Sequence, residues 1–124
     1  MGKLARLVGA SSNVRRRDIL LRRARVEIGR DAANDIVVRH PSVSRSHARI
    51  ARAGDRYTIA DLRSTNGVRV TGNAYGKVEL RAGDYIDLGH VRFRFVAPGE
   101  KLDRSRDLKR IVVPTASRYR RRKP

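Results

Sequence analysis

The sequence contains no cysteine among its 124 residues, and all of its apolar segments are short. The absence of cysteine excludes disulfides, thiolate metal ligands and a thiol nucleophile, and it is consistent with a reducing compartment. No apolar run is long enough to cross a bilayer, and Leu7-Val8-Gly9-Ala10 is too short for the apolar region of a signal peptide. We therefore expect a cytoplasmic protein, or the cytoplasmic part of a longer, membrane-associated one.

Groups of residues that carry catalysis or bind metals are also missing. His40, His47 and His90 are scattered along the chain, and without cysteine they do not make a zinc site. There is no Gly-x-Ser-x-Gly elbow, no paired-carboxylate cluster and no glycine-rich loop before a predicted helix. We therefore expect a protein that is not an enzyme and that holds neither a metal nor another cofactor.

Acidic residues are scarce, because 12 Asp and Glu stand against 30 Lys and Arg, which gives a net charge of +18. The excess lies at the ends: residues 1–25 carry +7 (eight basic, one acidic), residues 26–100 carry +3 (twelve, nine) and residues 101–124 carry +8 (ten, two). Such ends suggest contact with nucleic acid or an anionic membrane, and this is the alternative to the function developed below. Aromatic residues make up only 5% of the chain, which argues against base stacking.

Short apolar segments recur about every eight to twelve residues, separated by Gly, Asn, Asp or Pro, as is typical of an all-β sandwich or barrel. We predict an all-β sandwich of about ten to eleven short, mostly antiparallel strands with binding loops at one end. In the last segment Val91, Phe93 and Phe95 alternate with Arg92 and Arg94, so we expect both arginines to face solvent. The predicted strands cover residues 4–8, 19–21, 25–28, 36–38, 47–51, 57–60, 68–70, 77–80, 85–88 and 91–96.

The strand pattern also predicts the domain organisation. The alternation of apolar residues stops after Val96, and the following residues are mostly charged or small and polar, with Ile111-Val112-Val113 as an apolar group among them. Such a segment buries too little apolar surface to order itself. We therefore predict an N-terminal extension at residues 1–3, a sandwich at residues 4–97 and a basic, flexible tail at residues 98–124.

Polar clusters lie where predicted strands end or begin. Arg30 presents a planar fork of donors, and Ser44 and Thr65 offer hydroxyl groups, a combination that indicates an anion and specifically a phosphate. The amide of Asn66 is suited to the main chain of an extended peptide. Taken alone, each residue has an ordinary explanation, and Asn66-Gly67 by itself usually marks only a turn. The joint pattern carries the interpretation: Gly29-Arg30, Asn34-Asp35-Ile36, Ser42 to Ala48 and Asp61 to Gly67.

In type, order and approximate spacing, three of these segments resemble the signature of the forkhead-associated (FHA) domain, a β-sandwich that binds phosphothreonine peptides. The segments are Gly29-Arg30, Ser44-Arg45-Ser46-His47 and Ser64-Thr65-Asn66-Gly67, and the strand pattern extends the resemblance from about Leu4 to Val96. The resemblance implies a signalling module whose partner is a protein phosphorylated by a Ser/Thr kinase. Val68 stands where the family often has threonine, and the residue preferences around the phosphothreonine stay unpredicted.

The resemblance also implies a role for each site residue. Residues implied to bind the phosphopeptide are Arg30, Ser44, Arg45, Thr65 and Asn66. Residues implied to support the binding loops are Gly29, His47, Asp61 and Gly67.

Overall fold

The apolar segments form strands of two to six residues in the computed structural model, which describes residues 3–100. One sheet has the order β2-β1-β11-β10-β7-β8 and the other the order β4-β3-β5-β6-β9. A 3-10 helix, η1 (Ser12–Val14), lies between β1 and β2. The strands are β1 (Arg6–Gly9), β2 (Asp18–Leu20), β3 (Arg25–Gly29), β4 (Ile36–Val37), β5 (Ala48–Ala53), β6 (Arg56–Asp61), β7 (Val68–Val70), β8 (Asn73–Ala74), β9 (Lys77–Glu79), β10 (Tyr85–Leu88) and β11 (Val91–Val96).

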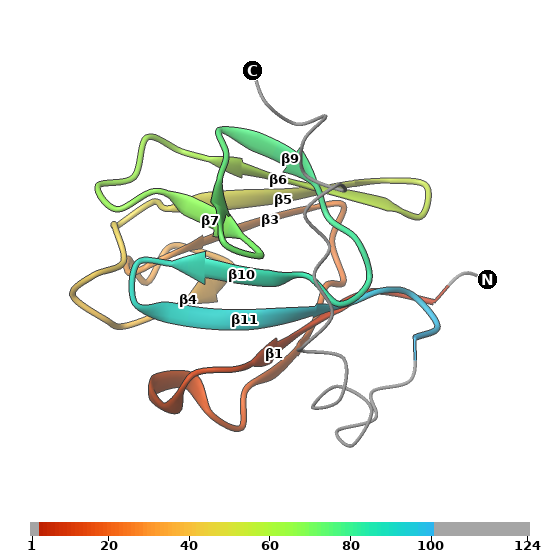
Figure 1. Ribbon diagram of the computed structural model, residues 1–124, viewed down its shortest axis with the longest axis horizontal. Helices are drawn as coiled ribbons and strands as arrows, with labels where there is room; N and C mark the ends of the chain where they lie inside the picture. Colours follow the sequence, from red (N-terminus) through yellow and green to blue (C-terminus); the bar gives the residue numbers. More distant parts are fainter. Residues whose placement is uncertain (1–2, 101–124) are drawn as a thin grey trace.

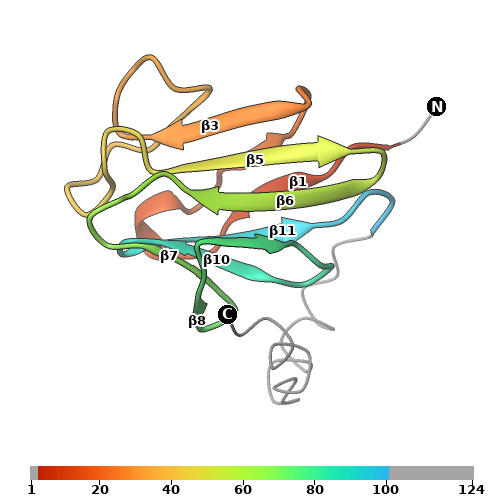
Figure 2. The same cartoon turned by 90° about the horizontal axis from the view of Figure 1, so that it is seen from above.

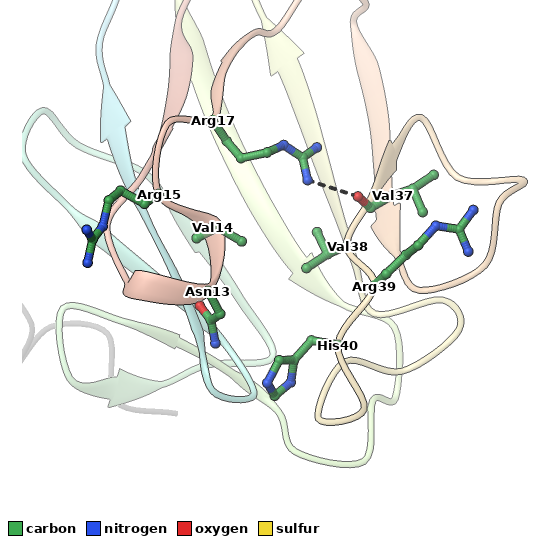
Figure 3. Close-up of a pocket in the computed structure, with 8 residues that line it drawn as sticks. All are labelled: Asn13, Val14, Arg15, Arg17, Val37, Val38, Arg39 and His40. Carbon is green, nitrogen blue, oxygen red and sulfur yellow. Dashed lines mark hydrogen bonds between the residues drawn. The ribbon is translucent and has the colours of Figure 1, made fainter.

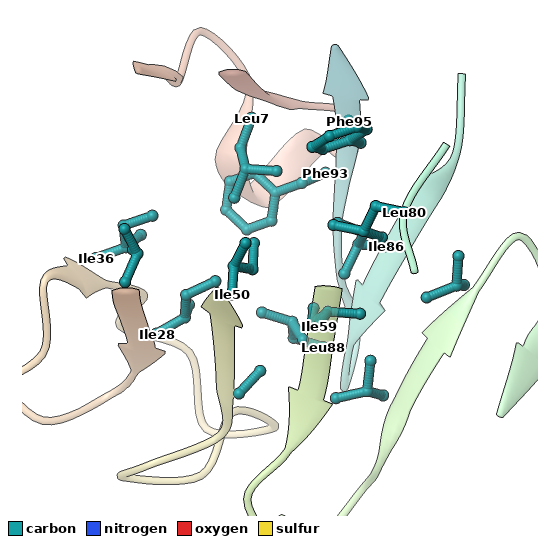
Figure 4. Close-up of a cluster of buried hydrophobic side chains, with 14 of the residues drawn as sticks. Leu7, Ile28, Ile36, Ile50, Ile59, Leu80, Ile86, Leu88, Phe93 and Phe95 are labelled. Carbon is teal, nitrogen blue, oxygen red and sulfur yellow. The ribbon is translucent and has the colours of Figure 1, made fainter. Parts of the chain in front are cut away.

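The two sheets pack face to face, with β3, β5 and β6 lying over β11, β10 and β7 (Figures 1 and 2). Alternate residues of the strands fill the space between the sheets, as Figure 4 shows for the central side chains. Tyr57 packs edge-on against Phe95 with ring centroids 5.5 Å apart, and its hydroxyl accepts the Ala5 N–H at 3.0 Å. This bond satisfies the polar end of a buried aromatic side chain.

The predicted all-β sandwich is confirmed. Every strand pair is antiparallel except β3 with β4, which is parallel and aligns Ile28 with Ile36. The sequence pattern missed the two-residue strand β8 and the helix η1, because neither has enough residues for a periodic signal. Within residues 3–100 no helix combines the length and the apolar character of a membrane span.

Arg94 corrects one expectation from the sequence, because it is buried (5% exposed) while Arg92 faces solvent. A turn after β11 covers it: the Glu100 carboxylate accepts from Arg94 Nη2 at 2.9 Å and from the Ala97 N–H at 2.8 Å. A buried guanidinium needs a carboxylate partner, and this one comes from beyond the last strand. The alternation of residue types predicts which face of the sheet a side chain lies on, but it does not predict whether another segment covers that face.

This contact bears on the domain boundary. Of the predicted tail at residues 98–124, residues 101–124 lie outside the described part of the chain, as do residues 1 and 2 of the predicted N-terminal extension. We propose that the sandwich extends through Glu100 and that the tail after it is separable.

Two fragments test this boundary by thermal unfolding. The fragment 1–100 is expected to melt like the whole chain, whereas the fragment 1–97 loses the carboxylate that bonds to Arg94 and should be less stable by about 1.5 to 3 kcal/mol. Glu100→Ala in the whole chain should reproduce most of this loss. Equal melting temperatures for the two fragments would show that the Glu100 contact does not contribute to stability.

The strand directions bring several loops to one end of the sandwich. Ile28 near the end of β3 pairs with Ala48 at the start of β5, which in turn pairs with Asp61 at the end of β6. In the other sheet Leu88 pairs with both Val68 and Val91. The connections β3–β4, β4–β5, β6–β7 and β10–β11 therefore meet at the same end, at the left of Figure 2.

Candidate functional site

The 30–35, 38–47 and 62–67 loops, named by their residues, are tied together by backbone and amide contacts. The Arg30 N–H donates to the Ser44 carbonyl at 2.9 Å, and the Asp31 N–H donates to the Arg45 carbonyl at 3.2 Å. Asn34 adds a side-chain contact, because its Nδ2 donates to the Arg45 carbonyl at 2.7 Å and to the Asp31 carbonyl at 2.9 Å. The first two loops therefore form one rigid unit.

Gly29 permits this close approach. A Cβ atom at Gly29 would lie 2.1 Å from the Arg45 carbonyl oxygen and 2.7 Å from Asn34 Nδ2. Real Cβ atoms do not come so near to other heavy atoms, so any side chain here would push the two loops apart. The glycine is needed for space and not for an unusual φ angle.

Arg30 is exposed, and its guanidinium is oriented by the neighbouring loop. Its Nε donates to the Val43 carbonyl at 2.9 Å. Neither terminal nitrogen bonds to another group within residues 3–100, and no carboxylate pairs with Arg30 in that range. The side chain therefore presents two donor nitrogens from a fixed position, which suits an anion with two or more oxygens.

Ser44 lies half-buried beside this cation. Its hydroxyl oxygen accepts the Thr65 N–H at 2.9 Å, which links the 38–47 loop to the 62–67 loop. Since the oxygen acts as an acceptor in that bond, the hydroxyl proton remains to be donated to a further acceptor. Thr65 itself is exposed, so its own hydroxyl is accessible from solvent.

His47 is completely buried (0% exposed) and links the 38–47 loop to the 62–67 loop. Its Nδ1 accepts the Ser44 N–H at 3.0 Å, and its Nε2 lies 2.8 Å from the Gly67 carbonyl oxygen. The first contact requires an unprotonated Nδ1 and the second requires N–H at Nε2, so the geometry defines one neutral tautomer. Both ring nitrogens bond to backbone groups, and neither points to solvent.

Asp61 and Ser64 close the 62–67 loop. One Asp61 carboxylate oxygen, Oδ1, accepts the Ser64 N–H at 3.0 Å and the Ser64 hydroxyl at 2.6 Å. The Ser64 hydroxyl oxygen in turn accepts the Gly67 N–H at 2.9 Å. Gly67 has a φ of 81°, in the left-handed region that favours glycine.

The Asn66 amide bonds within the protein in this structure. Its Nδ2 donates to the Ser42 carbonyl at 2.8 Å, which leaves the amide oxygen to accept from a ligand. Ser42 also bonds to the β10–β11 turn, because its hydroxyl oxygen accepts the His90 N–H at 2.8 Å. The prediction that Asn66 binds a peptide main chain stays untested.

The structure brings the nine predicted site residues to one end of the sandwich and adds three to which no role was assigned, Asn34, Ser42 and Ser64. All three belong to sequence segments already singled out as polar clusters. Their positions in those clusters were the only available signal, because a bond between two loops has no pattern along the chain.

A cleft of about 410 Å³ nearby is lined by none of the predicted residues. It separates residues 13–17 from residues 37–40, and Arg17 bridges it through a 3.1 Å bond from Nη1 to the Val37 carbonyl, while Arg15 and Arg39 extend away from its rims (Figure 3). This cleft is therefore separate from the candidate site, whose residues Arg30, Arg45, Thr65 and Asn66 are exposed on the loops. Residues 3–100 hold no group of three or more His, Asp or Glu side chains placed to bind a metal ion.

The charges around the site are mostly positive and accessible. Arg30, Arg45 and Arg63 are exposed, and none is in an ion pair within residues 3–100. The acids on these loops bond to nearby backbone: Asp31 accepts the Ala33 N–H, and Asp35 accepts the Glu27 N–H and pairs with Arg23.

Arg92 and Asp87 form an ion pair between β11 and β10, outside the site. The hydrogen bond to Asp87 raises the pKa of Arg92.

Fold and site together define an all-β module that presents cationic and hydroxyl groups from loops at one end. Residues 26–89 match the sequence profile of the FHA domain, and the chain belongs to this family. It is 43% identical over 76 residues to the transcriptional regulatory protein EmbR of Mycobacterium tuberculosis, a match that covers 60% of this chain and 20% of EmbR. The chain thus spans about one fifth of the length of this relative.

Solved structures give the same assignment. The fold is similar to that of Mycobacterium tuberculosis EmbR in complex with a low-affinity phosphopeptide, with a TM-score of 0.73 and 36% identity over 82% of this chain and 26% of EmbR. It is also similar to an FHA domain studied for phosphothreonine-dependent interactions, with a TM-score of 0.69 and 30% identity over 75% of this chain and 95% of that domain.

Proposed function

We propose that this protein is a phosphopeptide-binding signalling module that captures phosphothreonine on a partner protein with its three site loops. The observation that carries the proposal is the fixed Arg30 guanidinium, whose Nε bonds to the Val43 carbonyl while neither terminal nitrogen bonds to an acceptor within residues 3–100. A group held in position before the ligand arrives loses little entropy on binding. The relatives described above support the same function.

The phosphate of a phosphothreonine carries close to two negative charges and offers three acceptor oxygens. Arg30 binds two of these oxygens with its terminal nitrogens, and the Ser44 hydroxyl donates its proton to the phosphate. Thr65 and Arg45, both exposed on the adjoining loops, bind the rim of the phosphate or the peptide beside it. The peptide main chain is bound through the amide oxygen of Asn66.

The supporting residues keep these groups in place without touching the ligand. Gly29 allows the 30–35 and 38–47 loops to approach, and His47 joins the 38–47 loop to the 62–67 loop. Asp61 and Gly67 shape the 62–67 loop. The module acts by binding alone, without catalysis, and its partner is a protein phosphorylated by a Ser/Thr kinase.

A peptide-library selection tests this function. The whole chain is immobilised and exposed to peptides that carry phosphothreonine at the centre of randomised flanks, beside an identical library with unphosphorylated threonine. Peptides should be retained from the first library only. A phosphoserine library is the matched control, and its peptides should bind several-fold more weakly, because one methyl group in a fitted site is worth about 1 to 3 kcal/mol. Equal retention from the phosphorylated and unphosphorylated threonine libraries, or none from either, would refute the proposal.

A further inference from the structure

Arg63, in the 62–67 loop, has a backbone conformation that is unusual for a residue other than glycine. Its φ is 58°, in the left-handed region that is costly for residues with a Cβ and that glycine adopts freely. Strained backbone conformations of this kind cluster at functional sites, where the strain can be part of ligand binding or mechanism. The question is therefore what the arginine side chain contributes at this position that glycine would not.

The structure gives Arg63 no role within the described part of the fold. The side chain is exposed, and neither an ion pair nor a side-chain hydrogen bond holds it within residues 3–100. Five other arginines in this range are paired with carboxylates: Arg6, Arg23, Arg49, Arg92 and Arg94. Stability of the sandwich therefore does not account for the choice of arginine at this position.

The location of Arg63 suggests a ligand. Leu62, just before it, donates its N–H to the His47 carbonyl, and Ser64, just after it, is fixed by Asp61. Thr65, two residues further on, bonds to the Ser44 hydroxyl. Two residues of chain span at most about 7 Å, so the Arg63 Cα lies within that distance of the Thr65 Cα, next to the N–H that bonds to Ser44. A long, unpaired cation at this distance reaches residues that neighbour the phosphothreonine.

We propose that Arg63 is a specificity-determining residue that favours phosphothreonine peptides with an acidic side chain within about four residues of the phosphothreonine. The inference rests on the proposed function and adds the class of peptide that the site prefers. The neighbouring Arg45 is also exposed and unpaired within residues 3–100, and the nearby acids Asp31 and Asp35 bond to backbone N–H groups. An acidic residue of the ligand therefore meets two arginines that pair with no carboxylate of residues 3–100.

The test uses the whole chain and one phosphothreonine peptide retained in the selection above. The peptide is resynthesised with Glu or with Gln at each of the four positions on either side of the phosphothreonine, and each form is titrated calorimetrically. At one or more positions Glu should bind about threefold more tightly than Gln, the scale of an exposed ion pair. Added salt should lower this ratio.

Two substitutions and a matched control separate this role from others. Arg63→Gly and Arg63→Asn both suit a positive φ and remove the cation, so the Glu-to-Gln ratio should fall to about one while the melting temperature does not fall. Arg56→Gln removes one exposed charge from the start of β6, at the opposite end of the sandwich, and should keep the ratio.

Three results would overturn the inference: a ratio that persists in both Arg63 variants, a ratio that falls equally in Arg56→Gln, or a melting temperature that falls in both Arg63 variants. The first would assign the preference to another residue, the second to general electrostatics and the third would make Arg63 structural. Failure of the proposed function looks different, because then the Gln peptides would bind no better than their unphosphorylated forms.

Discussion

Arg30→Ala is expected to lose phosphothreonine-peptide binding while the sandwich stays folded. The substitution removes the two terminal nitrogens that face the ligand, and it leaves the phosphate beside Ser44 without its cation. Deleting one partner of a close, charge-assisted pair costs on the order of 2 to 5 kcal/mol, which weakens binding by roughly 30-fold or more. Calorimetric titration of a peptide retained in the selection measures this loss directly.

Arg25→Ala is the matched control for this variant. Arg25 begins β3 and Arg30 follows its end, so both variants delete one exposed arginine flanking the same strand, at opposite ends of the sandwich. Arg25→Ala should bind the peptide like the unaltered chain. If both variants bound with unchanged affinity, Arg30 would not be a phosphate ligand and the site would have to be sought elsewhere.

Arg30→Lys separates charge from geometry. Lysine keeps a positive charge but has neither the planar fork nor an Nε–H to donate to the Val43 carbonyl. We expect it to recover only a small part of the affinity lost in Arg30→Ala. Full recovery would show that a positive charge is sufficient and that the bond to Val43 has no part in positioning the guanidinium.

Much of the fold was predictable because its information is local. Strands such as β10 and β11 have alternating apolar residues and a two-residue turn at Gly89-His90, and each of these signals acts within a few residues. The burial of Arg94 was not predictable in this way. It depends on Glu100, which lies beyond the last strand and returns to cover the sheet.

The same distinction applies to the candidate site. Arg30, Ser44 and Asn66 could be chosen because their chemistry suits a phosphopeptide and their order resembles a known signature. The bonds from the Asn34 amide to the Arg45 carbonyl and from the Asn66 amide to the Ser42 carbonyl depend on two loops meeting in space, and nothing along the sequence states which carbonyl each amide will bond to. The steric need for Gly29 is likewise a property of the 2.1 Å approach to another loop.

His47→Ala is expected to cause the largest loss of stability among substitutions in the candidate site. The imidazole is completely buried, and its removal leaves the Ser44 N–H and the Gly67 carbonyl without their partners. Each unsatisfied buried group costs about 1 to 3 kcal/mol, and the cavity left by the ring adds to this cost. We therefore expect a total near 3 to 5 kcal/mol, which lowers the melting temperature by roughly 12 °C or more at about 4–8 °C per kcal/mol.

Peptide binding by His47→Ala should weaken less than by Arg30→Ala when it is measured well below the melting temperature. The groups proposed to bind phosphate remain, and the two loops keep other links, including the bond between the Thr65 N–H and the Ser44 hydroxyl. Thermal unfolding and calorimetry on the same preparation give both quantities. A variant that melts like the unaltered chain but no longer binds peptide would make His47 a ligand.

Two further substitutions resolve which bond of His47 matters. Glutamine is long enough to keep a donor near the Nε2 position and thus the bond to the Gly67 carbonyl, whereas asparagine keeps an acceptor near Nδ1 for the Ser44 N–H. Because each retains one of the two bonds, both should be more stable than His47→Ala and less stable than the unaltered chain. If neither is more stable than alanine, the shape of the ring and not its hydrogen bonds holds the loops together.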